Sequence, residues 1–130
     1  MTKVTKIFAG AGLAAAAAIA VAQQAGFTRT PLQDQDITDP AKHVVQVRAE
    51  FQPGVAAGRH THPGEEFGYV LEGTLVLEID GKPPVTLNAG EVFFVPAGMV
   101  HDGRNVGSGS AKVLATYVVE KGKPVASPAK

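Results

Sequence analysis

The sequence contains no cysteine and no tryptophan, and it has only two tyrosines among its 130 residues. Without cysteine, a disulfide scaffold, a thiolate zinc site, a cysteine nucleophile and a lipid-modified cysteine are all excluded. The scarcity of aromatic rings disfavours a stacking platform for nucleic-acid bases. Lys and Arg number 12 and Asp and Glu number 12, which gives a formal net charge of zero, and no basic block is present. These features argue against nucleic acid as the main partner.

The first 22 residues have the composition of a secretory signal peptide. Lys3 and Lys6 precede an uncharged, alanine-rich stretch from Ile7 to Ala22, and Ala20-Val21-Ala22 fits the small-x-small cleavage rule. We predict cleavage after residues 1–22, a periplasmic or secreted location, and no stable membrane insertion afterwards. The alternative is an uncleaved membrane anchor, but this stretch falls short of the ~20 strongly apolar residues that a span needs.

The rest of the chain changes character at residue 43. Residues 23–42 are polar and contain two prolines, and we predict a polar N-terminal arm there. Across residues 45–51, apolar and polar side chains alternate with the period of two that is typical of a strand. Similar short runs follow, separated by turns rich in glycine and proline, which indicates an all-β antiparallel sandwich or barrel. We assign residues 43–120 to a barrel domain and 121–130 to a C-terminal tail.

One of the expected strands is apolar on both of its faces. Phe67, Tyr69 and Leu71 share one face, whereas Gly68 and Val70 share the other. A single sheet would leave one of these faces in water, whereas two stacked sheets and a subunit interface would cover both. We therefore predict a homodimer. The alternative is a monomer that tolerates some exposed apolar groups.

Three of the four histidines fall within two short segments. His60 and His62 are two residues apart, so their side chains leave an extended strand on the same face. Glu66 follows a Pro-Gly bend that returns its carboxylate towards them, and His101 follows a Pro-Ala-Gly turn. Three imidazoles and one carboxylate suit a divalent metal and leave two coordination positions open. Taken singly, each residue is equally explained as an exposed polar group, so the joint spacing carries the prediction.

Two glycine-containing motifs surround these residues. The first reads G-x5-H-x-H-x3-E-x6-G from Gly54 to Gly73, and the second reads G-x5-P-x-G-x2-H-x3-N from Gly90 to Asn105. At every fixed position they resemble the two motifs of the cupin superfamily, and the chain is similar to small, single-domain, type-2-like cupins that bacteria export. The resemblance implies a double-sheet, jelly-roll-like antiparallel β-barrel that holds one divalent transition metal on His60, His62, Glu66 and His101.

The same resemblance leaves three functions open, because cupins include enzymes of several classes as well as binding modules. The first is a metal-dependent, dioxygenase-like or hydrolytic enzyme that acts on a small organic molecule. The second is a non-catalytic module that binds a metal or small ligand, and the third is a barrel with a purely structural metal. The donor set suits Mn, Fe, Ni, Co, Cu or Zn. Gln46, Arg59 and Tyr69 are candidates for the cavity wall, and no catalytic residue is assigned.

Overall fold

The computed structural model describes residues 24–130, so the predicted signal peptide at residues 1–22 lies outside the described part. Within residues 24–130 every regular element is a β-strand. The strands are β1 Phe27–Asp36, β2 Lys42–Phe51, β3 His60–Thr61, β4 Gly64–Glu72, β5 Thr74–Ile79, β6 Val85–Asn88, β7 Val92–Val95, β8 His101–Asn105, β9 Ala111–Glu120 and β10 Ser127–Pro128.

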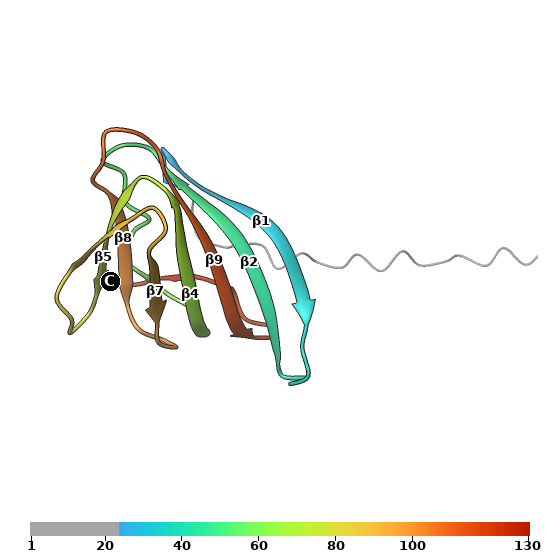
Figure 1. Ribbon diagram of the computed structural model, residues 1–130. Coiled ribbons are helices and arrows are strands. Elements are labelled where there is room, and N and C mark those ends of the chain that lie inside the picture. Colours follow the sequence, from blue (N-terminus) through green and yellow to red (C-terminus); the bar gives the residue numbers. More distant parts are fainter. Residues whose placement is uncertain (1–23) are drawn as a thin grey trace, which may run out of the picture.

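The strands form two antiparallel sheets that face each other, as Figure 1 shows. The larger sheet has the order β1-β2-β9-β4-β7, and the smaller has the order β10-β3-β8-β5-β6. Every strand pairing is antiparallel. The predicted all-β, double-sheet antiparallel fold is therefore confirmed.

The space between the sheets is filled by side chains from alternate strand positions. In β9 each second residue is buried, and the same alternation runs through β2 and β4. The largest of the fully buried aliphatic side chains are Val47, Val70, Leu75, Val95 and Val119. Burial of each such side chain stabilises the fold by about 1.5–3 kcal/mol relative to exposure. This apolar core holds the two sheets in a fixed relation, which a site between them needs.

The turns that the two motifs predict are present. Gly54, Gly73, Gly90 and Gly98 all have positive φ, at 76°, 81°, 89° and 72°, a conformation that residues with a Cβ rarely adopt. Gly73 has a second constraint, since a Cβ there would lie 2.6 Å from the Ser110 carbonyl oxygen. The connection between β4 and β5 therefore requires glycine on two grounds.

The barrel extends beyond both predicted boundaries, so the expected limits of residues 43 and 120 are too narrow. The segment predicted as a polar arm contains β1, which pairs with β2 from Phe27↔Phe51 to Asp36↔His43. Most of β1 is exposed, so it has the polar composition of a linker, and main-chain pairing makes it a strand. In the predicted tail, β10 pairs with β3 and Val125 is buried.

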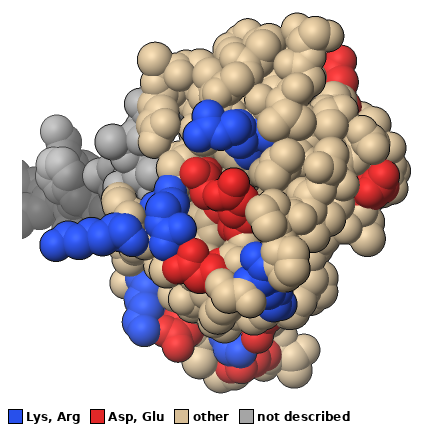
Figure 2. Space-filling view, turned by 90° about the vertical axis from the view of Figure 1, so that its left-hand side faces the viewer, with Lys and Arg blue, Asp and Glu red and all other residues tan. Residues whose placement is uncertain are grey.

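The two sheets present chemically different outer faces. The larger sheet exposes apolar side chains on β4 and β7, among them Phe67, Tyr69, Val92 and Phe94. Over the β5–β8 side, Figure 2 shows acidic and basic side chains interspersed. There Arg59 donates two hydrogen bonds to the Asp80 carboxylate, at 2.8 and 2.9 Å. No helix in residues 24–130 has the length and hydropathy of a membrane span.

Candidate metal centre

Four side chains from both sheets meet inside the barrel. His60 lies on β3 and pairs in register with His101 on β8, so the smaller sheet brings these two imidazoles together. His62 follows β3 directly, and Glu66 extends from β4 of the larger sheet. One donor atom from each of the four lies within 4.8 Å of the others, and all four side chains are buried. The structure therefore brings together every residue that was predicted as a ligand.

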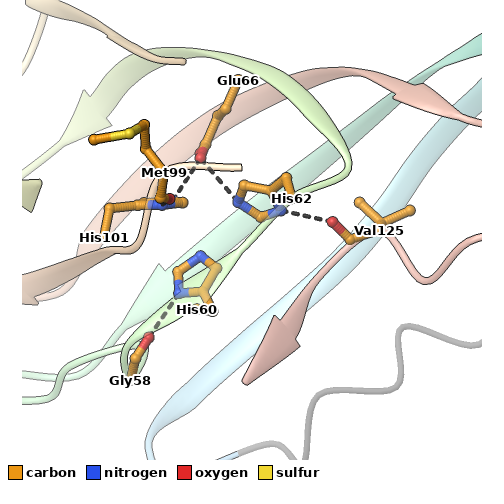
Figure 3. Close-up of polar contacts among 7 residues, drawn as sticks. All are labelled: Gly58, His60, His62, Glu66, Met99, His101 and Val125. Atoms are coloured by element: carbon orange, nitrogen blue, oxygen red, sulfur yellow. Dashed lines mark hydrogen bonds and ion pairs between the residues drawn. The ribbon is translucent and has the colours of Figure 1, made fainter. Parts of the chain in front are cut away.

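Each histidine is held by a backbone carbonyl on its far ring nitrogen, as Figure 3 shows. The Nδ1 atoms of His60, His62 and His101 lie 2.6, 2.6 and 2.9 Å from the carbonyl oxygens of Gly58, Val125 and Met99, respectively. A carbonyl only accepts, so each Nδ1 carries the donated proton. In the neutral imidazole, Nε2 then has its lone pair free, and this lone pair is the form that binds a metal.

The remaining contacts fit a cation at the centre of the cluster. Glu66 Oε2 lies 3.0 Å from the Nε2 atoms of both His62 and His101. A nitrogen lone pair and a carboxylate oxygen repel each other at that distance unless a proton or a metal ion lies between them. Two ligands ~2.1 Å from one ion and at right angles are themselves about 3.0 Å apart. The contact of Glu66 with His62 Nε2 is an ion-pair contact without the alignment of a hydrogen bond, so this buried nitrogen has no hydrogen-bond partner. A metal ion would supply that partner.

The surroundings set the charge of each group. Burial, reinforced by the nearby His101 and His62, lowers the pKa of His60 to about 3, so His60 is neutral at neutral pH. Burial works to raise the pKa of Glu66, but the close contacts of its carboxylate with His101 and His62 outweigh burial and hold that pKa well below its usual range. Burial works to lower the pKa of His101, but contact with Glu66 outweighs burial, and the pKa of His101 is raised. The cluster thus offers an ionised carboxylate beside imidazole nitrogens.

The groups around these side chains fix their positions. The Asp102 carboxylate accepts a hydrogen bond of 2.9 Å from the backbone N–H of Gly58, whose carbonyl in turn holds His60. The Tyr117 ring packs against His62 with 4.4 Å between ring centres. Such supporting contacts keep metal ligands in the right tautomer and orientation.

A small cavity of about 30 Å³ adjoins the cluster. His60, Glu66 and His101 line it together with Arg29 and Tyr117, which sequence reasoning had not singled out. No short motif contains these last two residues, because the pairing of distant strands places them there. The main polar groups that line the cavity are therefore the metal-ligand side chains, the guanidinium of Arg29 and the phenol of Tyr117.

The three cavity candidates named from the sequence lie elsewhere. Arg59 pairs with Asp80 on the surface, and Tyr69 is 44% exposed on the outer face of the larger sheet. The amide of Gln46 donates to Thr116, away from the cavity lining. Strand parity alone was insufficient to place these three residues.

A double-sheet β-barrel with a buried His-His-Glu-His cluster between its sheets defines a cupin-type metal-binding domain. The chain matches the Cupin_2 family model, described as a cupin domain, over residues 47–117, and it belongs to that family. The donor set supports a single divalent metal ion.

Curated relatives include enzymes and a regulator. Oxalate oxidase 2 from Hordeum vulgare is 30% identical over 110 residues, which cover 72% of this chain and 49% of that protein. The HTH-type transcriptional regulator PuuR from Escherichia coli is 32% identical over 80 residues, which cover 61% of this chain and 43% of PuuR. This chain thus spans less than half the length of either relative.

The solved structures agree with this placement. An oxalate oxidase in complex with the substrate analogue glycolate superposes with a TM-score of 0.64 at 26% identity, covering 78% of this chain and 54% of that one. A cupin superfamily protein from Desulfitobacterium hafniense has a TM-score of 0.61 at 21% identity, covering 81% of this chain and 88% of that one. At this lower identity the second likeness supports the fold alone.

Proposed function

We propose that the protein is a metal-dependent, dioxygenase-like oxidoreductase that acts on a small organic molecule. The observation that carries this proposal is the convergence of three Nε2 lone pairs and one ionised carboxylate beside a cavity. Four protein donors leave coordination positions open, as a catalytic site requires and a structural site does not. The similarity to oxalate oxidases from plants and in solved structures supports the same class.

The residues of the chain have distinct parts in this function. His60, His62, Glu66 and His101 would hold the metal, which when bound supplies Lewis-acid and redox chemistry to a substrate. The backbone carbonyls behind the imidazoles keep each Nε2 directed at the ion. The apolar walls of the cavity exclude bulk water and so strengthen the electrostatic interactions inside it.

The test is elemental analysis of protein purified from its own host, followed by oxygen uptake with small organic acids, diketones and catechols. We expect about one redox-active metal per chain and oxygen consumption that disappears in Glu66→Ala. Stoichiometric zinc without turnover would instead indicate a structural metal. Ligand exchange at the metal without turnover would indicate a non-catalytic binding module. Absence of metal from protein never exposed to a chelator would contradict the ligand assignment.

We also propose that the protein works outside the cytoplasm on a small molecule and does not bind nucleic acid. The support is the signal-peptide composition of residues 1–22 and the mixed charge of the chain. Mass spectrometry of the host protein would give the mature N-terminus, expected at Gln23, and cell fractionation would give its location. A shift of the protein on a nucleic-acid gel at physiological salt would contradict the choice of partner.

We further propose that the exposed apolar face of the larger sheet forms a homodimer interface. Phe67 is 51% exposed, Val92 67% and Phe94 47%, and they line a groove of about 620 Å³ on that face. Contiguous apolar surface of this kind marks protein interaction sites. Light scattering should give twice the mass of the mature chain, and Val92→Lys should give the mass of one chain. An unchanged mass for Val92→Lys would contradict the interface, and Lys82→Ala on an exposed turn serves as the control.

A further inference from the structure

A buried arginine lies in the wall of the cavity that adjoins the metal cluster, and neither cupin motif contains it. Arg29 is 8% exposed and lines the cavity beside His60 and Tyr117. Its guanidinium carbon lies 4.7 Å from the centre of the Phe27 ring. A charged side chain with so little exposure needs a reason for its burial.

The pairing of β1 with β2 directs Arg29 inwards. Arg29 pairs with Ala49, and paired residues of antiparallel strands project from the same face. Ala49 is buried, as is Ala115 on the neighbouring strand β9, and both line the cavity. Because both side chains are single methyl groups, the long arginine side chain has room to reach across the sheet towards the cluster.

Arg29 has no anionic partner of its own. Across residues 24–130, no carboxylate lies within ion-pair distance of its guanidinium. Arginine stays charged in proteins, so the charge is not lost on burial. A divalent ion and Arg29, with Glu66 as the one carboxylate, would give the site a net charge of about +2. A site with this charge and little water attracts an anion.

We propose that Arg29 binds the carboxylate group of the ligand held at the metal centre, and that the ligand class is small organic carboxylates. The inference rests on the proposed metal-dependent function and names its substrate class. A guanidinium matches the two oxygens of a carboxylate with parallel N–H donors. Tyr117 and Phe27, which lie beside Arg29 in the cavity wall, are not anions and leave these donors available to a carboxylate. The cavity is small, at about 30 Å³, so it favours the smallest organic acids.

The experiment uses glycolate as probe and its neutral amide, glycolamide, as a matched control. The mature protein is loaded with diamagnetic Zn²⁺, and the Arg29 Nε–Hε signal, identified by its absence in Arg29→Gln, is followed by NMR. We expect glycolate to shift this signal saturably and glycolamide to leave it in place. An unmoved signal at saturating glycolate, or equal shifts with the two compounds, would overturn the proposal.

The variants measure how much the guanidinium contributes. We expect glycolate affinity to fall about 10- to 100-fold in Arg29→Gln and by a smaller factor in Arg29→Lys, because hydrogen bonds to charged groups have this strength. Arg48→Gln is the matched control, since Arg48 lies on the adjacent strand β2, half exposed beside Glu50. Equal affinity in wild type and Arg29→Gln would refute the assignment.

Two further readouts separate this inference from folding defects and from the proposed function. Removal of a buried charge without a counter-ion should leave thermal stability unchanged or higher. If Arg29→Gln does not fold, the NMR titration of the wild type and the glycolate affinity of Arg29→Lys test whether Arg29 binds the carboxylate. Metal content is measured in the same samples. If the wild type binds no metal, the proposed function fails, and the Nε–Hε titration of metal-free protein still decides the role of Arg29 in the same way.

Discussion

The interior of the barrel has two regions that differ in what they need to be stable. The apolar region contains Val70, Leu75 and Val95, all buried and in contact with apolar neighbours. The polar region contains the His-His-Glu-His cluster and Arg29, which are also buried, but the Nε2 of His62 lacks a hydrogen bond. Apolar burial stabilises a fold unconditionally, whereas buried polar groups stabilise it only when each is satisfied. The polar region therefore depends on a bound ion, and the apolar region does not.

The largest expected effect comes from removing the one anionic ligand. Glu66→Ala should lower metal affinity at least about 100-fold, because it deletes the carboxylate that β4 contributes to the centre. Competition with a chelator, followed by elemental analysis, measures this. Glu65→Ala, one position along and with an outward-facing side chain, should bind metal as the wild type does. Retention of full metal by Glu66→Ala against the chelator would refute the ligand set.

The next effect concerns the apolar region alone. Leu75→Ala should lower the free energy of unfolding by about 2–5 kcal/mol, since it leaves a cavity where a 2% exposed leucine was packed. Urea unfolding should give the same loss with and without metal, because Leu75 supplies no ligand atom to the ion. Leu71→Ala, at a position 45% exposed, should change stability by at most about 0.5 kcal/mol. A loss for Leu75→Ala that appears only without metal would abolish the distinction between the two regions.

A third effect is the pH dependence of the metal-free protein. Burial lowers the pKa of His60 from 6.5 in the unfolded chain to about 3, so below pH 6.5 the unfolded state binds a proton that the folded state does not. Stability should therefore fall as pH falls from 6.5 towards 3, with a slope of about 1.4 kcal/mol per pH unit. The raised pKa of His101 adds no slope below pH 6.5, where both states are protonated.

Urea unfolding between pH 6.5 and 5.5 measures this slope, because in that range the Glu66 carboxyl is almost fully ionised in both the folded and the unfolded state. His60→Gln should reduce the slope in the metal-free protein. Saturating metal should reduce it in the wild type as well, since the ion occupies the imidazole nitrogen. An equal slope in His60→Gln would assign the proton to another group.

The smallest effect belongs to the surface. The Arg59–Asp80 ion pair has side chains 44% and 49% exposed, and water screens such pairs almost completely. Asp80→Asn should leave the melting temperature unchanged within error, at both low and high salt, with metal or without. A loss comparable to that of Leu75→Ala would show that the pair supports the adjacent His60.

The ligand set and the fold were predictable because their signals are local. His60, His62 and Glu66 fall within a few residues of one another, and the strand parity that put Phe67 and Val70 on opposite faces is confirmed by their burial. Arg29 was missed because its place in the cavity depends on the register Arg29↔Ala49 between two strands. In sequence it lies in a polar segment that has the composition of a linker, and no short pattern marks it.

The carbonyl of Val125, which accepts the proton of His62 Nδ1, was equally invisible in the sequence. A backbone oxygen has no residue type of its own, and this one lies 63 positions from the histidine that it holds. Long-range contacts of this kind follow from the completed fold and from no motif. Sequence reasoning therefore found the four predicted ligand residues and missed the groups that support them.

The contact between His62 and Val125 connects the orientation of a metal-ligand side chain to the pairing of β10 at the edge of the smaller sheet. β10 is held to β3 at only two residue pairs, Ser127↔Thr61 and Pro128↔His60, with a further hydrogen bond from Ala129 N–H to Arg59. Detachment of this short strand would leave Val125 held by its burial in the core alone, and so would loosen the carbonyl that orients His62. We therefore expect metal dissociation to be coupled to fraying of β10. The bound ion in turn should slow amide hydrogen exchange at Ala129, far along the chain from any ligand.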